Sequence, residues 1–271
     1  MGFPDDGFAL VNDWSAVEAT GPDAGKFLQS FCTNDVLKLA DGESCEAMFT
    51  DVKAHVVAYG WVARLAETSY TVVLGSPRAE GLHAHLDRYL IREQVELTVK
   101  TLPQVRIAKQ AEGVPLEAFG AGVRASWQDH ASAVGGSRLT PEAFEEFRFS
   151  LRVPLDGRDV DERNLPQEID RNEQAISFTK GCYLGQEPVA RIDALGRVNW
   201  LLRTIEIDGP PPERDTPLML GEKPAGRVTS SIATETGSLA LAYVRREQAE
   251  AGTELAVSGD RVRVLPKGSA S

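Results

Sequence analysis

The sequence predicts an α+β fold that ends in a small β-barrel. Up to residue 196, helix-start signals alternate with runs of alternating apolar residues, which is typical of mixed helices and strands. After residue 196, short β-type segments follow one another between glycine and proline turns, at 200–207, 226–233, 238–244, 254–258 and 261–265. Five short strands without an intervening helix indicate a small barrel or sandwich. We place a domain boundary at 196–199.

The N-terminal part begins with a strand, a helix and a strand pair. A strand is expected at 8–12. A helix follows, because Pro22 suits the first helical position and Asp23 the positive end of the helix dipole. Apolar and β-branched runs at 55–63 and 69–74 then predict two paired strands.

Two further helices carry clear start signals. Ser76-Pro77 and Thr140-Pro141 each offer a capping hydroxyl followed by proline at the first helical position. Between these helices, the alternating residues 94–100 predict a strand. The stretch 154–174 is polar and irregular, and a long loop in a compact domain is usually functional or disordered.

Composition limits the classes of function. The 271 residues contain no apolar stretch long enough for a membrane span. A net charge of −11 argues against a broad nucleic-acid surface, because nucleic-acid affinity comes largely from neutralising phosphates. The three cysteines, Cys32, Cys45 and Cys182, form no CxxC pair and fit a reducing compartment such as the cytoplasm. Since a usual iron–sulfur cluster needs four thiolates, we expect no intrinsic metal, and any link to clusters must run through a partner.

The segment 180–187, Lys-Gly-Cys-Tyr-Leu-Gly-Gln-Glu, is the strongest candidate for chemistry. Gly181 and Gly185 bracket Cys182 and permit backbone conformations closed to other residues. A thiol beside a lysine and before a helix N-terminus holds more thiolate, the form that attacks electrophiles or binds metal. Two interpretations of Cys182 stay open, a reactive thiol and a buried structural one. For the other two cysteines we expect core positions.

The same segment resembles the signature of the YgfZ family, K-G-C-[FY]-x-G-Q-E. Further matches lie in family order over nearly the whole chain: the Pro-Gln-Glu element at 165–168, the N-terminal hallmark shared with the aminomethyltransferase (T-protein) of glycine cleavage at 21–29 and 33–36, and its C-terminal barrel at 226–230 and 240–245. The resemblance implies a T-protein-like, folate-binding fold around a central opening. It also implies three domains: an N-terminal folate-binding domain at 1–100, a central domain carrying the cysteine loop at 101–197, and the barrel at 198–271.

The resemblance implies two groups of site residues. Cys182 would be the reactive group and Lys180 its electrostatic support, in a loop completed by Gly181, Tyr183, Gly185, Gln186, Glu187 and Arg191. Tetrahydrofolate or a related folate would contact Trp14, Phe144, Asn34 and Arg148. The two aromatic side chains could stack on the ligand's rings, and ordinary core packing is the alternative for both.

Two departures from the family pattern bear on function. Ser150 and Arg152 stand where relatives often carry Glu and Gly, and a hydroxyl cannot accept the paired hydrogen bonds that a carboxylate accepts from a pterin. The turn at 53–59 lacks the aspartate that T-proteins use for aminomethyl transfer. Because loss of a positioned acid–base group costs about 10²–10⁴-fold in rate, we expect no aminomethyl transfer.

Three functions agree with these observations. The first is a cytoplasmic, folate-binding accessory protein that supports iron–sulfur cluster assembly or repair through partner proteins, including iron–sulfur enzymes that modify tRNA. The second is a tetrahydrofolate-dependent one-carbon transferase. The third is a folate-free interaction scaffold, which Ser150 and Arg152 favour. We expect the first, acting without catalysis and without direct contact to nucleic acid or membrane.

Overall fold

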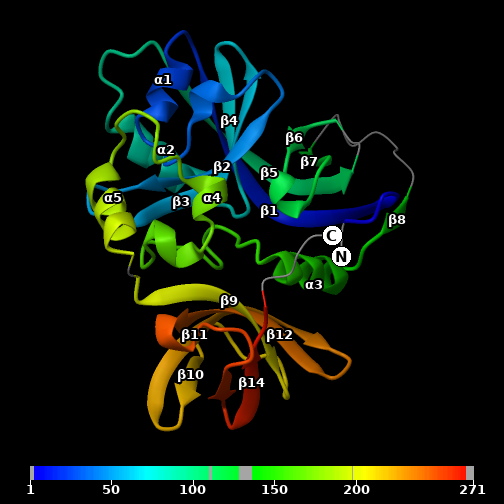
Figure 1. Ribbon diagram of the computed structural model, residues 1–271. Coiled ribbons are helices and arrows are strands. Elements are labelled where there is room, and N and C mark those ends of the chain that lie inside the picture. Colours follow the sequence, from blue (N-terminus) through cyan, green and yellow to red (C-terminus); the bar gives the residue numbers. More distant parts are fainter. Residues whose placement is uncertain (1–2, 110–111, 128–135, 197, 267–271) are drawn as a thin grey trace.

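The computed structural model describes residues 3–109, 112–127, 136–196 and 198–266. These residues form a large sheet with helices on both faces and a separate closed barrel beneath it (Figure 1). The predicted α+β class with a C-terminal barrel is therefore confirmed.

The sheet is built around one long central strand. Its hydrogen-bonded order is β2-β3-β4-β1-β5-β7-β6, with β8 pairing in parallel to the start of β1. The other pairs are antiparallel. The strands are β1 (Gly7–Thr20), β2 (Ser44–Thr50), β3 (Val56–Ala66), β4 (Ser69–Leu74), β5 (Glu96–Lys109), β6 (Val114–Pro115), β7 (Val123–Ser126) and β8 (Ser137–Arg138).

Side chains that alternate along β1 divide the core between the two faces of the sheet. Trp14 and Ala16 join an apolar cluster with the helix α3, whereas Val17 and Ala19 join a cluster with α1 and α2. The helical segments are α1 (Ala24–Gln29), η1 (Val36–Lys38), α2 (Ala79–Asp87), η2 (Glu117–Phe119), α3 (Pro141–Leu151), η4 (Pro166–Ile169), α4 (Asn172–Ala175), α5 (Gln186–Leu195) and η5 (Arg246–Gln248).

One helix start is as predicted and another is not. The Thr140 hydroxyl accepts a hydrogen bond from the backbone N–H of Ala143 at 3.1 Å and caps α3. Ser76, the predicted cap of the second helix, lies outside it, since α2 begins at Ala79. The Ser76 hydroxyl instead donates to the carboxylate of Asp156 at 2.8 Å, and the backbone N–H of Ala79 donates to the hydroxyl of Ser15 at 3.0 Å.

The barrel closes in the order β10-β11-β12-β9-β14-β13. Its strands are β9 (Trp200–Ile207), β10 (Pro217–Leu220), β11 (Lys223–Thr234), β12 (Gly237–Arg245), β13 (Glu254–Val257) and β14 (Asp260–Val264). The sequence reading missed β10, a four-residue strand that closes the barrel by pairing with both β11 and β13.

The domain limits at residues 100 and 197 stay a prediction. The large sheet takes strands from both sides of residue 100, and β5 runs across it. Residue 197 lies outside the described residues, and the first barrel strand begins at Trp200.

Candidate functional site

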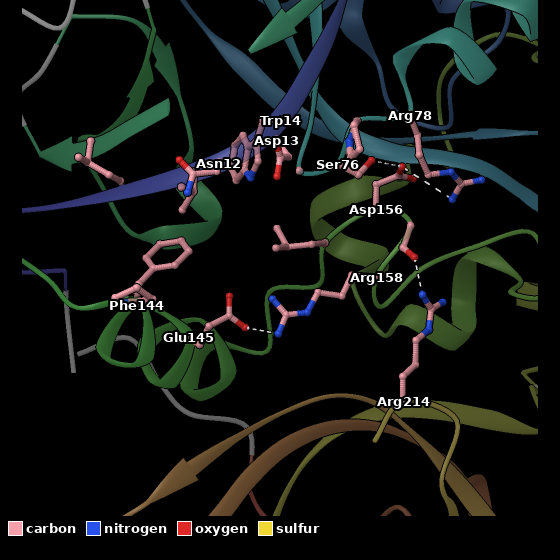
Figure 2. Close-up of a pocket in the computed structure, with 17 residues that line it drawn as sticks. Asn12, Asp13, Trp14, Ser76, Arg78, Phe144, Glu145, Asp156, Arg158 and Arg214 are labelled. Carbon is pink, nitrogen blue, oxygen red and sulfur yellow. Dashed lines mark hydrogen bonds and ion pairs between the residues drawn. The ribbon is translucent and has the colours of Figure 1, made fainter. Parts of the chain in front are cut away.

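A cavity of about 590 Å³ lies between the sheet, α3 and the loop that follows α3 (Figure 2). Five segments from different parts of the chain build its wall. They contribute Leu10, Val11, Asn12, Asp13 and Trp14 from β1, Gly75, Ser76, Pro77 and Arg78 before α2, Pro141, Phe144 and Glu145 from α3, Leu155, Asp156, Gly157 and Arg158 after it, and Arg214 before the barrel strand β10.

A local break in β1 shapes one wall of this cavity. Asp13 has a φ of 58°, the left-handed region, which Asp tolerates better than most residues. Pairing with β5 is present at Asn12 and at Trp14 but not at Asp13, whose counterpart in register is Pro103. Proline has no backbone N–H to donate, so the break at Asp13 loses few hydrogen bonds between β1 and β5.

The two predicted aromatic residues lie in the same cavity wall. Trp14 is 2% exposed and stacks on Trp61, with ring centroids 5.7 Å apart and an interplanar angle of 7°. Phe144 is 4% exposed and stacks on Phe119 at 5.6 Å. Each ring is fixed by a second aromatic ring, which leaves a rigid apolar surface beside the cavity.

Two of the cavity carboxylates are held by the protein itself. Glu145 accepts hydrogen bonds from Arg148 and lies 3.0 Å from a guanidinium nitrogen of Arg158. Asp156 accepts hydrogen bonds from the backbone N–H of Tyr59 and from Ser76, at 2.9 and 2.8 Å. Burial raises the pKa of Asp156 despite these hydrogen bonds.

Arg148 is fully buried and supports the wall from behind. Besides Glu145, its guanidinium binds the carbonyl of Val153 at 2.8 Å and the carboxylate of Asp159 at 2.6 Å. Burial opposes ionisation of Asp159, but Arg148 and the hydroxyl donors Ser230 and Thr229 outweigh it, so the pKa of Asp159 lies below its usual value. Arg148 therefore joins α3 to the barrel strand β11.

Asn34 lies elsewhere. Its side-chain amide donates to the backbone carbonyls of Glu46 and Gln174, both at 2.8 Å. Of the four predicted folate contacts, the structure brings Trp14 and Phe144 to the cavity, whereas Arg148 and Asn34 are not among the described residues that line it.

The cysteine loop is anchored by Lys180. This side chain is 7% exposed, and its ammonium group donates to the carbonyls of Gln29, Cys32 and Asn34, each at 2.7 Å. The Sγ atom of Cys32 lies 3.8 Å from it. Burial lowers the pKa of Lys180. The charge expected beside Cys182 is therefore used to hold the backbone after α1, and Cys182 itself is exposed.

Gly185 fixes the other end of this loop. It has a φ of 83°, and a Cβ atom there would lie 2.5 Å from both the Asp51 carbonyl oxygen and the Thr50 hydroxyl. The same hydroxyl donates to the carbonyl of Leu184 at 2.7 Å. The loop thus packs tightly against the end of β2, and the helix predicted after the thiol is α5, which begins at Gln186.

The remaining loop residues differ in burial. Tyr183 is buried, its ring lies 5.1 Å from the Lys180 ammonium, and burial raises its pKa to about 12. Glu187 and Arg191 form an exposed ion pair at 2.7 Å on α5. Gly181 has no atom within 4 Å of a Cβ placed on it, so sterics do not require glycine there.

Comparison with known proteins finds two domain families and several relatives that this chain resembles. The GCVT N-terminal domain family matches residues 9–108, and the CAF17 C-terminal β-barrel domain family matches residues 202–269. The tRNA-modifying protein YgfZ of Cronobacter sakazakii is 25% identical over 281 residues, covering 90% of this chain and 85% of that protein. Over most of its length the chain is similar to YgfZ proteins.

Two further comparisons concern a second relative and a solved structure. The mitochondrial iron–sulfur cluster assembly factor IBA57 homolog of Neurospora crassa is 26% identical over 226 residues, which cover 71% of this chain and 52% of that protein. The crystal structure of the glycine cleavage system aminomethyltransferase T of Bartonella henselae superposes with a TM-score of 0.67 at 16% identity, over 96% of this chain and 85% of that one. This likeness confirms the T-protein-like fold predicted from the YgfZ resemblance.

Ser150 and Arg152, which depart from the YgfZ family pattern, are not among the described residues that line the cavity. Ser150 is exposed and donates to the carbonyl of Phe147 at 2.7 Å. Arg152 is buried, with a guanidinium nitrogen 3.5 Å from Asp170. Burial and the nearby Arg203 lower the pKa of Arg152 to about 10.

Sequence reasoning missed most of the polar cavity residues. It singled out neither Asp13 nor Glu145, and it assigned Ser76 to a helix cap. The irregular polar stretch 154–174 was the one sequence signal for these residues, since it contributes Asp156 and Arg158 to the cavity wall. Within the described ranges, no group of three or more His, Cys, Asp or Glu side chains could hold a metal ion, and no helix has the length and apolarity of a membrane crossing.

Proposed function

We propose that this YgfZ-like protein is a cytoplasmic, folate-binding accessory protein that supports iron–sulfur cluster assembly or repair. The names of two relatives support this function: one is a tRNA-modifying protein and the other is an iron–sulfur cluster assembly factor. The observation that carries the folate part is the cavity, which combines a rigid aromatic wall with cationic side chains.

The cavity suits the two chemically different ends of a folate. Figure 2 shows Phe144 at one end and Arg78 and Arg214 at the other. Trp14 and Phe144 would contact a flat heterocycle through their apolar surfaces, and the arginines would attract the carboxylates of a glutamate tail. Bound tetrahydrofolate would supply a carrier for one-carbon units.

The Cys182 loop would serve the partner protein. Its thiol is exposed and its backbone is fixed on both sides, by Lys180 and by Gly185. A thiolate presented in this way can bind an exposed iron of a cluster carried by a partner enzyme. The cluster is cargo in this scheme, because three cysteines fall short of the four ligands that a usual cluster needs.

The test is complementation of a bacterial strain that lacks its YgfZ homologue. Activity of an iron–sulfur enzyme that modifies tRNA is measured after expression of the wild-type chain, of Cys182→Ala and of the matched control Cys45→Ala. We expect rescue by the wild type and the control and little rescue by Cys182→Ala. Full rescue by Cys182→Ala would refute the thiol's role, and failure of the wild type would refute the accessory function.

One-carbon transfer is the second candidate, and one observation favours it. Asp156 is a buried carboxyl group in the cavity wall whose pKa is raised by burial, as is common for acid–base groups. An aminomethyl thioether is the substrate to test, because its methylene group can pass to tetrahydrofolate without oxidation, with methylene-tetrahydrofolate, ammonia and the free thiol as products. Turnover that disappears in Asp156→Asn would establish this activity, and the absence of turnover by the wild type would exclude it for that substrate.

A further inference from the structure

The cavity holds one carboxylate that the protein does not use. Glu145 and Asp156 each accept hydrogen bonds from protein donors on both carboxylate oxygens. Asp13 is exposed to the cavity and has no hydrogen-bond or ion-pair partner among the described residues. An unpaired carboxylate beside a fixed indole ring is available to a ligand.

The backbone conformation at Asp13 gives this carboxylate its direction. In a regular strand, successive side chains point to opposite faces, so neighbours do not share one cavity. Five consecutive residues of β1, from Leu10 to Trp14, nevertheless line this one. The left-handed conformation at Asp13 accounts for the change, and Figure 2 shows the Asp13 carboxylate directed into the cavity beside Asn12 and Trp14.

A left-handed conformation at a residue other than glycine costs free energy, and such residues cluster at ligand sites. Here the strand resumes its register immediately, with Asn12 paired to Gln104 and Trp14 to Leu102. The left-handed conformation at Asp13 therefore does not shift the register between β1 and β5. Its visible effect is to place an amide and a carboxylate side by side in the cavity wall.

We propose that Asp13, together with Asn12, determines ligand specificity by binding the amino-amide edge of a pterin. This inference rests on the proposed folate function. That edge presents two adjacent N–H donors and a carbonyl acceptor. A carboxylate can accept both donor hydrogens in a fork, and the Asn12 amide can donate to the carbonyl.

This assignment resolves the departure at Ser150. The YgfZ resemblance places a pterin-binding carboxylate of relatives at the position of Ser150, but Ser150 is exposed and bonded to its own helix. Asp13 supplies the same chemical group from β1 instead. Trp14, the next residue, would then stack near the ring whose edge Asp13 binds.

The test is calorimetric titration of Asp13→Asn, which keeps the shape and the tolerance of a positive φ but replaces one acceptor oxygen with a donor. Glu80→Gln, an exposed site on α2, removes the same charge away from the cavity. Three ligands are compared: tetrahydrofolate, p-aminobenzoylglutamate, which lacks the pterin, and guanosine, which shares the pterin's edge but lacks the tail.

We expect Asp13→Asn to weaken tetrahydrofolate binding by about 10-fold or more and to leave p-aminobenzoylglutamate binding unchanged, with Glu80→Gln like the wild type. Guanosine should bind more weakly than tetrahydrofolate, with the same dependence on Asp13. Equal tetrahydrofolate affinity in Asp13→Asn and the wild type would overturn this inference and leave the folate function standing. Absence of tetrahydrofolate binding by the wild type, or tighter binding of guanosine, would overturn the folate function as well.

Discussion

The cavity and the Cys182 loop use charge in opposite ways. In the cavity, charged side chains from distant segments converge on an open space, with Glu145 from α3 and Arg214 from before the barrel. At the loop, Lys180 is only two residues from Cys182, yet its ammonium group turns into the protein and holds three carbonyl oxygens. Proximity in sequence is thus a poor guide to electrostatic partners where one of the two positions is buried.

A buried polar frame nevertheless connects the two regions. The Tyr59 backbone binds the cavity residue Asp156, and its hydroxyl donates to Glu46, which also pairs with Arg171. The Asn34 side chain binds the Glu46 carbonyl, and Lys180 binds the Asn34 carbonyl. Substitutions in this frame should therefore affect stability before they affect chemistry.

The largest expected effect is on the cavity side, in Arg148→Met. This change leaves Asp159 buried without its cation, and breaking a buried pair costs about 3–5 kcal/mol. Urea unfolding at neutral pH measures the loss. Arg158→Met is the control, because this half-exposed arginine pairs with the same Glu145 and should cost about 1 kcal/mol or less.

The same variant has a defined pH dependence. The lowered pKa of Asp159 stabilises the wild type above the unfolded carboxyl pKa of about 3.9, and this stabilisation is lost as the pH falls through the folded value. The difference in free energy of unfolding between the wild type and Arg148→Met should therefore shrink below about pH 4. A difference independent of pH would contradict the pairing.

Lys180→Met should produce the next largest effect. It leaves the carbonyls of Gln29, Cys32 and Asn34 without their donor, at a cost of about 2–3 kcal/mol, whereas the exposed Lys53→Met should be neutral. Chemical denaturation gives the stability, and alkylation of the folded protein gives the reactivity of Cys182. If Lys180→Met kept wild-type stability but slowed the alkylation of Cys182, Lys180 would activate the thiol electrostatically, as the sequence suggested.

Alanine substitutions at two glycines of the Cys182 loop should have smaller effects on stability, and these effects should differ from each other. Gly185→Ala introduces a Cβ atom that meets Asp51 and Thr50 at a positive φ, and should cost about 1–3 kcal/mol. Gly181→Ala meets no atom within 4 Å and should change stability by about 0.5 kcal/mol or less. Thermal unfolding of both variants measures this, and equal losses would show that the loop is not held as described.

The sequence predicted what local patterns determine. Thr140 caps α3 and the helix α5 follows Cys182, since both signals lie within about one turn of the helix start. Trp14 and Phe144 could be assigned to one site through family resemblance. By contrast, Ser76 was misassigned because its partner, Asp156, lies 80 residues away. The direction of Lys180 and the free carboxylate of Asp13 likewise depend on tertiary contacts that no local pattern encodes.

The central claim is that the cavity, and not the cysteine loop, binds the folate. Calorimetric titration with tetrahydrofolate of the wild type, Trp14→Phe and Cys182→Ser tests it most directly. The account predicts binding by the wild type, equal affinity in Cys182→Ser, and weaker binding in Trp14→Phe, which loses the larger ring of the cavity wall. No binding by the wild type, or a loss of affinity in Cys182→Ser with none in Trp14→Phe, would contradict it.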